Sequence, residues 1–171
     1  LTGNVSLRSD SVICEGMLFN TLGATAPAGG SGSYTFQWQE SISGDTWQPA
    51  SGVNNLQTYN PDTAQFASVE NRYFRRIVLS GPYDVCRHTS SPMRLTRYHA
   101  IRDNTISEGA TICAGSAPPA LTGSMPMGGS GSYTYLWQDS SASATWTTRS
   151  SAGFSYSPSA LNDSVWYRRI V

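Results

Sequence analysis

Hydrophobic and polar residues alternate along residues 34–39, so that aromatic side chains ending with Trp38 share one face of an extended chain. Polar residues fill the positions between them, and this period of two predicts a half-buried β-strand. The sequence GGSGS precedes the strand and favours a turn. The same turn and aromatic strand return at residues 128–138, with Trp137 in the place of Trp38.

Two further matches indicate that the chain is an internal repeat. Residues 12–16 (VICEG) correspond to residues 111–115 (TICAG), and residues 73–78 (YFRRIV) correspond to residues 166–171 (WYRRIV). A period of about 100 residues exceeds the roughly 20–50 residues of a solenoid unit and is the usual size of an immunoglobulin-like sandwich. The second match predicts a long strand beside the Trp38 strand in the same sheet.

Short apolar segments bounded by Gly, Pro, Ser and Asn supply further strands, at residues 1–10, 22–26 and 93–96. No segment sustains the helical period of about 3.6 residues. We therefore predict an all-β fold of two tandem immunoglobulin-like β-sandwich domains, residues 1–97 and 98–171.

The second domain is expected to be incomplete at its C-terminus. Its last residue, Val171, corresponds to Val78, and a counterpart of the closing strand at residues 93–96 is not among the 171 residues. A sheet edge without a partner invites pairing with another strand. We expect either that the native chain continues or that an identical subunit supplies the strand by edge addition.

The composition narrows the classes of protein. Charged residues make up 13% of the chain, about half the usual share of a soluble domain, and Ser, Thr and Gly take their place. Such a neutral, hydroxylated surface suits a β-rich extracellular protein. The 11 basic and 11 acidic residues balance. The chain therefore lacks the basic excess that favours nucleic-acid binding, and we expect no nucleic-acid partner. No apolar run approaches the roughly 20 residues that span a bilayer, so we expect no membrane insertion.

The block GGSGSYTYxWQ, with a later Thr-Trp, a Tyr-x-Pro and a Tyr-x-Arg-Arg-x-Val, resembles the immunoglobulin-like repeats of large surface and secreted proteins of Bacteroidota. Such proteins are often exported by type IX secretion, and some are adhesin-like or associated with gliding. The resemblance covers one full copy and most of a second, and it implies a stalk or spacer at the cell surface. The chain departs from the pattern in an insertion at residues 54–71 and in the spacing between Gly81 and Cys86.

Three cysteines in an extracellular-type chain leave one without an internal partner. Cys14 precedes the second predicted strand and Cys86 precedes the last one, and in a sandwich these two points can meet at one end. We therefore predict a Cys14–Cys86 disulfide and expect Cys113 to pair with a residue outside the 171. A catalytic or metal-binding cysteine is the alternative, but the chain contains no Cys-x-x-Cys motif.

Adjacent arginines occur once in each repeat, and on a strand their side chains point to opposite faces. One arginine of each pair must therefore lie over the core or its rim. Acidic residues at matching positions after the tryptophan strand are natural partners across the sheet. We predict a repeated structural ion pair, formed by Glu40 with Arg75 or Arg76 and by Asp139 with Arg168 or Arg169.

Tryptophan recurs at two positions of the repeat, which predicts that both positions pack in the cores: Trp38, Trp47, Trp137 and Trp146. The alternative is an exposed aromatic face for surface glycans, formed by Trp47, Trp146, Tyr59 and Tyr83. Core packing is the more economical interpretation, because a recurring position indicates a structural role.

Other candidate sites have simpler structural interpretations. Neither His88 nor His99 recurs in the second repeat, so exposed loop positions account for them better than a catalytic base does. The glycines at residues 29–32 lead into a strand, which favours a turn over a phosphate loop. Oxygen donors are scattered along the chain and form no dense calcium loop.

Taken together, these patterns favour a non-catalytic repeat segment of an extracellular adhesin or fibre. It would act as a stalk or spacer, would need no cofactor or metal, and would contact the neighbouring repeats of its own chain. The alternative is a carbohydrate-binding or accessory module of a secreted enzyme. Further repeats in the parent chain would favour the fibre, whereas a nearby catalytic domain would favour the accessory module.

Overall fold

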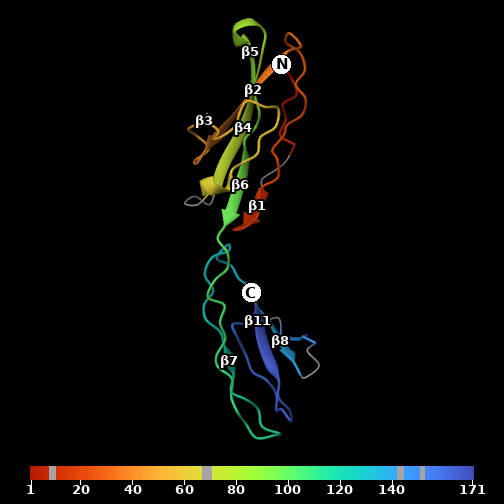
Figure 1. Ribbon diagram of the computed structural model, residues 1–171, viewed down its shortest axis with the longest axis vertical. Coiled ribbons are helices and arrows are strands. Elements are labelled where there is room, and N and C mark those ends of the chain that lie inside the picture. The colour runs from red at the N-terminus through yellow and green to blue at the C-terminus, as the bar shows by residue number, and fades with distance from the viewer. Residues whose placement is uncertain (8–10, 67–70, 142–144, 151–152) are drawn as a thin grey trace. The chain divides into compact units, whose positions relative to one another are not determined.

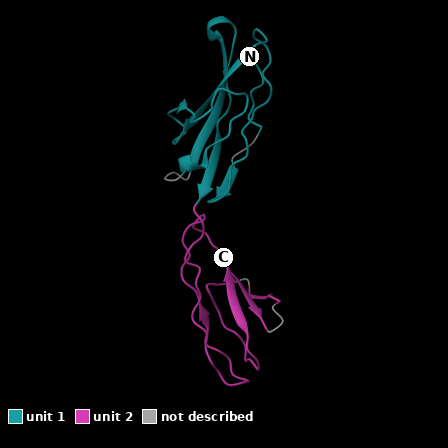
Figure 2. Cartoon of the chain, in the orientation of Figure 1, with its two compact units in different colours: residues 1–98 teal, residues 99–171 magenta. Residues whose placement is uncertain are grey.

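The structure, a computed structural model, describes most of the chain, in residues 1–7, 11–66, 71–141, 145–150 and 153–171. The chain is all-β and divides into two compact units, residues 1–98 and 99–171 (Figure 2). The helices among the described residues are two short 3-10 turns, Thr63–Phe66 and Pro82–Asp84. Neither is long and apolar enough to cross a membrane.

Unit 1 is built on a six-stranded sheet with the order β1-β6-β4-β2-β3, in which β5 also pairs with β4 (Figure 1). Its strands are β1 (Ser11–Cys14), β2 (Tyr34–Ser41), β3 (Gln48–Pro49), β4 (Asn71–Ser80), β5 (Cys86–Thr89) and β6 (Met93–Tyr98). β2 and β4 are antiparallel neighbours, with Trp38 opposite Arg76. This pairing confirms that the strands predicted at residues 34–39 and 73–78 share one sheet.

The two ends of β4 have different neighbours. β6 pairs antiparallel with residues 71–74 at one end, and β5 pairs antiparallel with residues 77–80 at the other. β1 lies on the far side of β6 and runs parallel to it, with Ser11 opposite Leu95 and Cys14 opposite Tyr98. The first and last strands of the sheet in unit 1 are therefore parallel neighbours.

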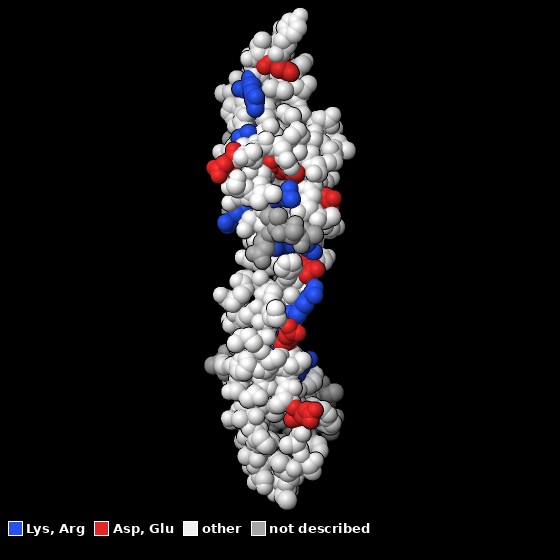
Figure 3. Space-filling model, turned by 90° about the vertical axis from the view of Figure 1, so that its left-hand side faces the viewer, with Lys and Arg blue, Asp and Glu red and all other residues white. Residues whose placement is uncertain are grey.

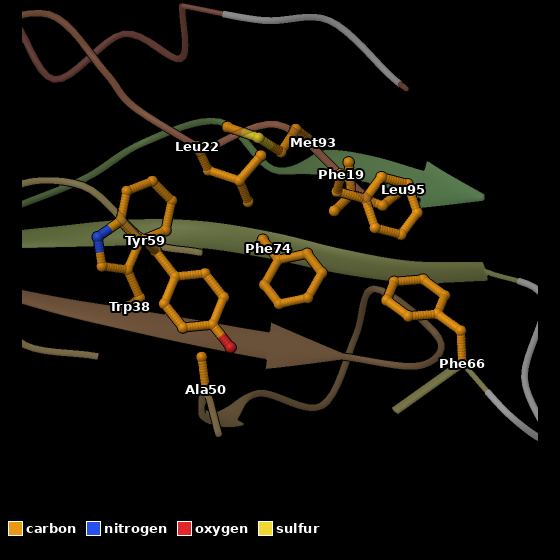
Figure 4. Packing of buried hydrophobic residues seen from close by; sticks show 9 residues of the cluster. All are labelled: Phe19, Leu22, Trp38, Ala50, Tyr59, Phe66, Phe74, Met93 and Leu95. Carbon is orange, nitrogen blue, oxygen red and sulfur yellow. The ribbon is translucent and has the colours of Figure 1, made fainter. Parts of the chain in front are cut away.

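Short bridges, rather than long strands, make up the layer that covers one face of this sheet. Leu22 bridges to Tyr59 in that layer, and both side chains pack against Trp38 and Phe74 of the sheet (Figure 4). The buried cluster comprises Phe19, Leu22, Trp38, Ala50, Tyr59, Phe66, Phe74, Met93 and Leu95. This layered arrangement is consistent with a β-sandwich.

The segment predicted as a first strand, residues 1–10, is not one continuous strand. It forms isolated bridges at Thr2 and Ser6, and its last residues, 8–10, lie outside the described part of the chain. Gly3 and Asn4 have φ values of 75° and 60°, which interrupt an extended chain because strands need negative φ. Residues 67–70 of the insertion also lie outside the described part.

Unit 2 repeats part of this plan. β8 lies between β11 and β9 in a three-stranded sheet, and β7 pairs with β10. The strands are β7 (Leu121–Thr122), β8 (Leu136–Ser140), β9 (Thr147–Ser150), β10 (Ser155–Tyr156) and β11 (Trp166–Ile170). Trp137 lies opposite Arg169, as Trp38 lies opposite Arg76 in unit 1.

Candidate functional site

Trp38 and Trp137 occupy equivalent central positions in the two units, and neither has any exposed surface. Each indole stacks on a tyrosine, Tyr59 with a centroid distance of 5.8 Å in unit 1 and Tyr156 with 6.0 Å in unit 2. The indole N–H of Trp38 donates a hydrogen bond to the Leu56 carbonyl at 3.0 Å. The one polar atom of this buried ring is thereby satisfied.

Arg76 lies beside Trp38 on the core side of β4, and its side chain has no exposed surface. Its Nε donates to Asn4 Oδ1 at 2.8 Å, while Nη1 and Nη2 donate to the carbonyls of Gln57 at 2.8 Å and Thr25 at 2.7 Å. Asn4 Nδ2 donates in turn to the Arg76 carbonyl at 3.1 Å. We call this reciprocal pair the arginine–asparagine clasp. It joins the N-terminal segment of the unit to its central strand.

Unit 2 contains a second arginine–asparagine clasp. Arg169 Nε donates to Asn104 Oδ1 at 2.8 Å, and Asn104 Nδ2 donates to the Arg169 carbonyl at 3.2 Å. Nη2 donates to the Ser124 carbonyl at 2.8 Å, whereas Nη1 has no hydrogen-bond partner among the described residues. Phe154 stands where unit 1 has Gln57, and its ring lies 5.5 Å from the guanidinium.

The clasp of unit 1 buries a cation among neutral groups. The partners of the Arg76 side chain in the described residues are amide and carbonyl oxygens, together with the Phe36 ring at 5.0 Å. Burial lowers the pKa of Arg76, because a cation loses hydration when it leaves water. Hydrogen bonds to all three of its nitrogen atoms compensate for that loss.

The neighbouring arginine of each pair points to the opposite face of the sheet. The Arg75 guanidinium lies 4.1 Å from the centre of the Trp47 ring, and its Nε donates to Gln39 Oε1 at 2.8 Å. Burial and the nearby charge of Arg87 lower the pKa of Arg75. We call this stack of tryptophan, arginine and glutamine the ladder. In the ladder of unit 2, the Arg168 guanidinium lies 4.2 Å from the centre of the Trp146 ring, and its Nε donates to Gln138 Oε1 at 2.8 Å.

The clasp and the ladder thus occur once in each unit, and the comparison with protein families divides the chain in the same way. A family model described as "Domain of unknown function (DUF8696)" matches residues 3–97 and 102–171. The chain belongs to the DUF8696 family. The two matched stretches fall within units 1 and 2, so each DUF8696 copy carries one clasp and one ladder. No curated protein and no solved structure matches the chain.

The predicted ion pairs of Glu40 and Asp139 with the adjacent arginines are wrong, because both carboxylates pair with other arginines. Glu40 is buried and lies 3.4 Å from Arg72, and Asp139 pairs with Arg149 at 2.8 Å. Arg76 and Arg169 each bond to an asparagine in the core. Arg75 and Arg168 each contact a tryptophan ring and a glutamine on the opposite face of the sheet.

Sequence reasoning missed Asn4 and Asn104. The available signal was an asparagine at an equivalent place near the start of each DUF8696 copy. Nothing local joins that position to an arginine on a distant strand, since Asn4 and Arg76 are 72 residues apart. Only the fold brings the two side chains together.

The predicted Cys14–Cys86 disulfide is not present, and all three cysteines are free thiols. Cys14 lies opposite Tyr98 near one end of β4, whereas Cys86 lies opposite Ser80 at the other end. Their strands, β1 and β5, lie toward opposite ends of the sheet (Figure 1). The 10 residues of β4 span about 30 Å, and a disulfide requires Cα atoms within about 7 Å. The two cysteines therefore sit at opposite ends of the sheet. The pairing of Cys113 outside the 171 residues stays a prediction.

Trp47 and Trp146 were predicted to pack in the cores, but they are half-buried and packed against arginines. Their sheet face is opposite to that of Trp38, because Arg75 and Arg76 alternate along β4. The aromatic face considered for glycans does not form either. Tyr59 is buried, guanidinium groups cover Trp47 and Trp146, and Tyr83 is exposed by itself on a 3-10 turn.

The remaining candidates have structural positions. His88 is a half-buried residue of β5 and not a loop residue, with Nδ1 3.3 Å from Asn4 Nδ2, whereas His99 is exposed. Gly29 and Gly30 have φ values of 81° and 68° in a turn that leads into β2. Among the described residues, no group of three or more His, Cys, Asp or Glu side chains could hold a metal ion.

Replacing Arg75 by alanine is expected to uncover Trp47 and to shift its fluorescence to longer wavelength. The free energy of unfolding should fall by about 1 kcal/mol or less, because a partly exposed cation–π contact contributes about 0.5–1 kcal/mol. Emission of Arg75→Ala is compared with and without Trp47→Phe, and Arg168→Ala is the matched variant in unit 2. Unchanged emission in both variants would contradict the ladder.

Proposed function

We propose that this chain is a stalk or spacer segment of immunoglobulin-like repeats that resists pulling force in an extracellular adhesin or fibre of the cell surface. The observation that carries the proposal is the parallel pairing of β1 and β6. These are the first and last strands of the sheet in unit 1, and β6 ends at the last residue of the unit.

Two strands that are first and last in the chain order of a unit, and are parallel neighbours in its sheet, resist extension in a specific way. When the ends of unit 1 are pulled apart, β1 and β6 slide along each other, and their hydrogen bonds are loaded together. An antiparallel hairpin pulled from its open end instead loses its hydrogen bonds one after another. Because the bonds between parallel strands are evenly spaced, the β1–β6 pair shares the load, which suits a stalk or spacer.

The arginine–asparagine clasp strengthens the same connection. Load that enters unit 1 at its first residue reaches Asn4 before it reaches β1. Asn4 is bonded to Arg76 of β4 through its side-chain oxygen and nitrogen, at 2.8 and 3.1 Å. The N-terminal segment is thus anchored to the central strand and not to a loop. Unit 2 contains the equivalent anchor in Asn104 and Arg169.

The pattern of surface charge and the roles of the repeated residues support a structural repeat. Acidic and basic residues are interspersed on the face shown in Figure 3, without a patch of one sign. The residues that recur in both units serve packing and hydrogen bonding, which favours a structural and non-catalytic role. A carbohydrate-binding module is less well supported, because guanidinium groups cover both repeated tryptophans that could stack on a sugar.

Replacing Glu15 by proline is expected to make unit 1 unfold about fivefold faster under a constant pulling force. The Glu15 N–H donates to the Tyr98 carbonyl at 2.8 Å, and one such bond contributes about 1 kcal/mol. The local turn should persist, since Met17 N–H bonds to the Cys14 carbonyl and Gly16 has a φ of 88°. Proline is favoured at the second position of that turn.

Single-molecule force spectroscopy on the full chain measures this rate. The control is Glu15→Gln, which keeps the backbone N–H and removes the carboxylate that lies 3.8 Å from Arg97. Unit 2 serves as the internal reference in each trace. Equal unfolding rates for Glu15→Pro and Glu15→Gln would show that the β1–β6 pair does not bear the load.

A further inference from the structure

Unit 1 contains an open pocket with a volume of about 320 Å³. Residues from 51 to 65 line it, and they belong to the stretch between Trp47 and Tyr73, in which unit 1 has more residues than unit 2 has between Trp146 and Trp166. The volume lies at the lower end of the roughly 300–1,000 Å³ that is usual for ligand pockets. The pocket is therefore large enough for a small ligand.

The lining of this pocket is polar without a positive charge. Its polar side chains are two hydroxyls, two carboxamides and one carboxylate: Ser51, Thr58, Asn60, Gln65 and Asp62. Val53 and Leu56 add apolar surface, and both are largely exposed. A lining without a cation disfavours an anionic ligand, and one carboxylate does not supply the set of oxygens that a calcium ion needs. The chemistry suits a neutral ligand with hydroxyl groups and an apolar face.

The side-chain amide of Gln65 is the group that points most directly to a ligand. Both of its polar atoms, Oε1 and Nε2, are buried, and neither has a hydrogen-bond partner among the described residues. Buried polar groups of folded proteins are nearly always paired, because an unpaired one loses its hydration without compensation. A carboxamide offers an acceptor and two donors, so a ligand with adjacent hydroxyls could pair with both atoms.

The polar groups around Gln65 already have partners within the chain. The Tyr59 hydroxyl, which points toward Ala50 in Figure 4, donates to the Ser51 carbonyl at 2.8 Å. The Gln65 carbonyl accepts from Arg72 Nη2 at 2.9 Å, which fixes the backbone. Burial raises the pKa of Tyr59 and the nearby Gln65 amide lowers it, although the two side chains form no hydrogen bond. The amide is thus held in place with both atoms available.

Asn60 and Asp62 are each fixed by one oxygen and keep a second polar atom for a ligand. Asn60 Oδ1 accepts from the Thr21 hydroxyl at 2.6 Å, which leaves the amide nitrogen as a donor. Asp62 Oδ1 accepts from the Ala64 N–H at 2.9 Å, at the start of the 3-10 turn that carries Gln65. The second carboxylate oxygen of Asp62 has no partner in the described part of the chain.

Unit 2 does not carry the same groups. One and three residues after the tyrosine that stacks on the central tryptophan, unit 1 has Asn60 and Asp62, whereas unit 2 has Ser157 and Ser159. The structural side chains of the clasp and the ladder recur in both units. Polar side chains that occur in unit 1 alone and line a pocket therefore indicate a role other than holding the fold.

We propose that the pocket of unit 1 binds a neutral saccharide unit. Hydroxyls of the sugar ring pair with the amides of Gln65 and Asn60 and with the carboxylate of Asp62, and the C–H groups of the ring pack on Val53 and Leu56. The site is separate from the tryptophans that the arginines cover. It does not depend on the mechanical role of β1 and β6, so the two proposals can fail independently.

Titration of the full ¹⁵N-labelled chain with methyl glycosides of glucose, galactose, mannose and N-acetylglucosamine tests the proposal by NMR. At least one glycoside is expected to shift the signals of the Gln65 side-chain amide and the Gly52 backbone N–H in a saturable way. The Ser157 backbone N–H of unit 2 should not shift, and glycerol should shift none of the three. The proposal is overturned if no glycoside gives a saturable shift, or if glycerol gives the same shifts.

Replacing Gln65 by methionine separates ligand binding from a structural role. Methionine has nearly the same shape, and the Gln65 amide makes no hydrogen bond within the described chain. The variant should therefore lose affinity for the glycoside at least tenfold, followed at Gly52, while the urea midpoint of unit 1 does not fall. A lower midpoint would identify the amide as a structural group and overturn the proposal.

Asp62→Ser tests a second contact without removing the turn, because serine can accept from the Ala64 N–H in the same way. The variant is expected to weaken binding at least fivefold. Asp45→Ser removes an exposed carboxylate outside the pocket and should leave the affinity unchanged. Equal affinities for Asp62→Ser, Gln65→Met and Asp45→Ser would show that the sugar binds elsewhere and would overturn the assignment of the site.

Discussion

Replacing Arg76 by methionine is expected to lower the free energy of unfolding of unit 1 by about 2–4 kcal/mol. Methionine can fill much of the apolar space of the arginine side chain, but it donates no hydrogen bond. Asn4 Oδ1 and the Thr25 carbonyl would lose the donors that now lie at 2.8 and 2.7 Å. A buried acceptor left without a partner costs about 1–3 kcal/mol.

Urea unfolding of the full chain, followed by NMR signals assigned to unit 1, measures this loss. Arg75→Met is the matched control on the next residue of β4, and it should cost about 1 kcal/mol or less. The variants Asn4→Ala and Asn4→Ala with Arg76→Met complete a double-mutant cycle. Strictly additive effects of the two substitutions would contradict the clasp.

Replacing Trp38 by alanine is expected to cost about 3–5 kcal/mol, which is the usual range for truncating a buried tryptophan. The side chain has no exposed surface and stacks on Tyr59 with a centroid distance of 5.8 Å. Its loss would leave a cavity and would also free the Leu56 carbonyl, which now accepts the indole N–H at 3.0 Å. Because a domain has about 5–15 kcal/mol of stability, unit 1 should become marginal.

The same urea experiment separates the two units. Unit 2 should unfold at an unchanged urea concentration in Trp38→Ala, and Trp137→Ala should reverse this pattern. Trp47→Ala is the control for loss of an indole, and we expect a smaller effect because Trp47 is half-buried. Similar losses for Trp38→Ala and Trp47→Ala would contradict the assignment of the two sheet faces.

The main strands could be predicted from the sequence because the alternation of aromatic and polar residues is a local property. Residues 34–39 alternate aromatic and polar side chains, and the structure places them on β2 with Trp38 facing the core. The match between residues 73–78 and 166–171 likewise indicated a strand beside the first, and β4 and β11 hold these positions. Where the local signal was weak, at residues 1–10, the structure has only isolated bridges.

The hydrogen-bond and ion-pair partners of the charged side chains could not be predicted from local sequence in the same way. Alternation along β4 required one arginine to face the core, and Arg76 does so. The nearest carboxylate by strand order was Glu40, but Glu40 lies against Arg72. Asn4 reaches Arg76 from 72 residues away, because the N-terminal segment folds back over the sheet. Hydrogen bonds of a buried cation depend on which distant segments arrive beside it.

The cysteines show the same limit at a larger scale. Their positions before two predicted strands were compatible with one end of a sandwich or with both ends. The order of strands around β4 places Cys14 and Cys86 at opposite ends, which no local pattern specifies.

Residue spacing alone was therefore sufficient for the all-β class, the internal repeat and the buried position of Trp38, since each depends on side chains that are close in sequence. The three-dimensional arrangement was needed for the clasp and the thiol positions. Each of these depends on contacts between segments tens of residues apart, and the free energy of the whole packed unit selects such contacts.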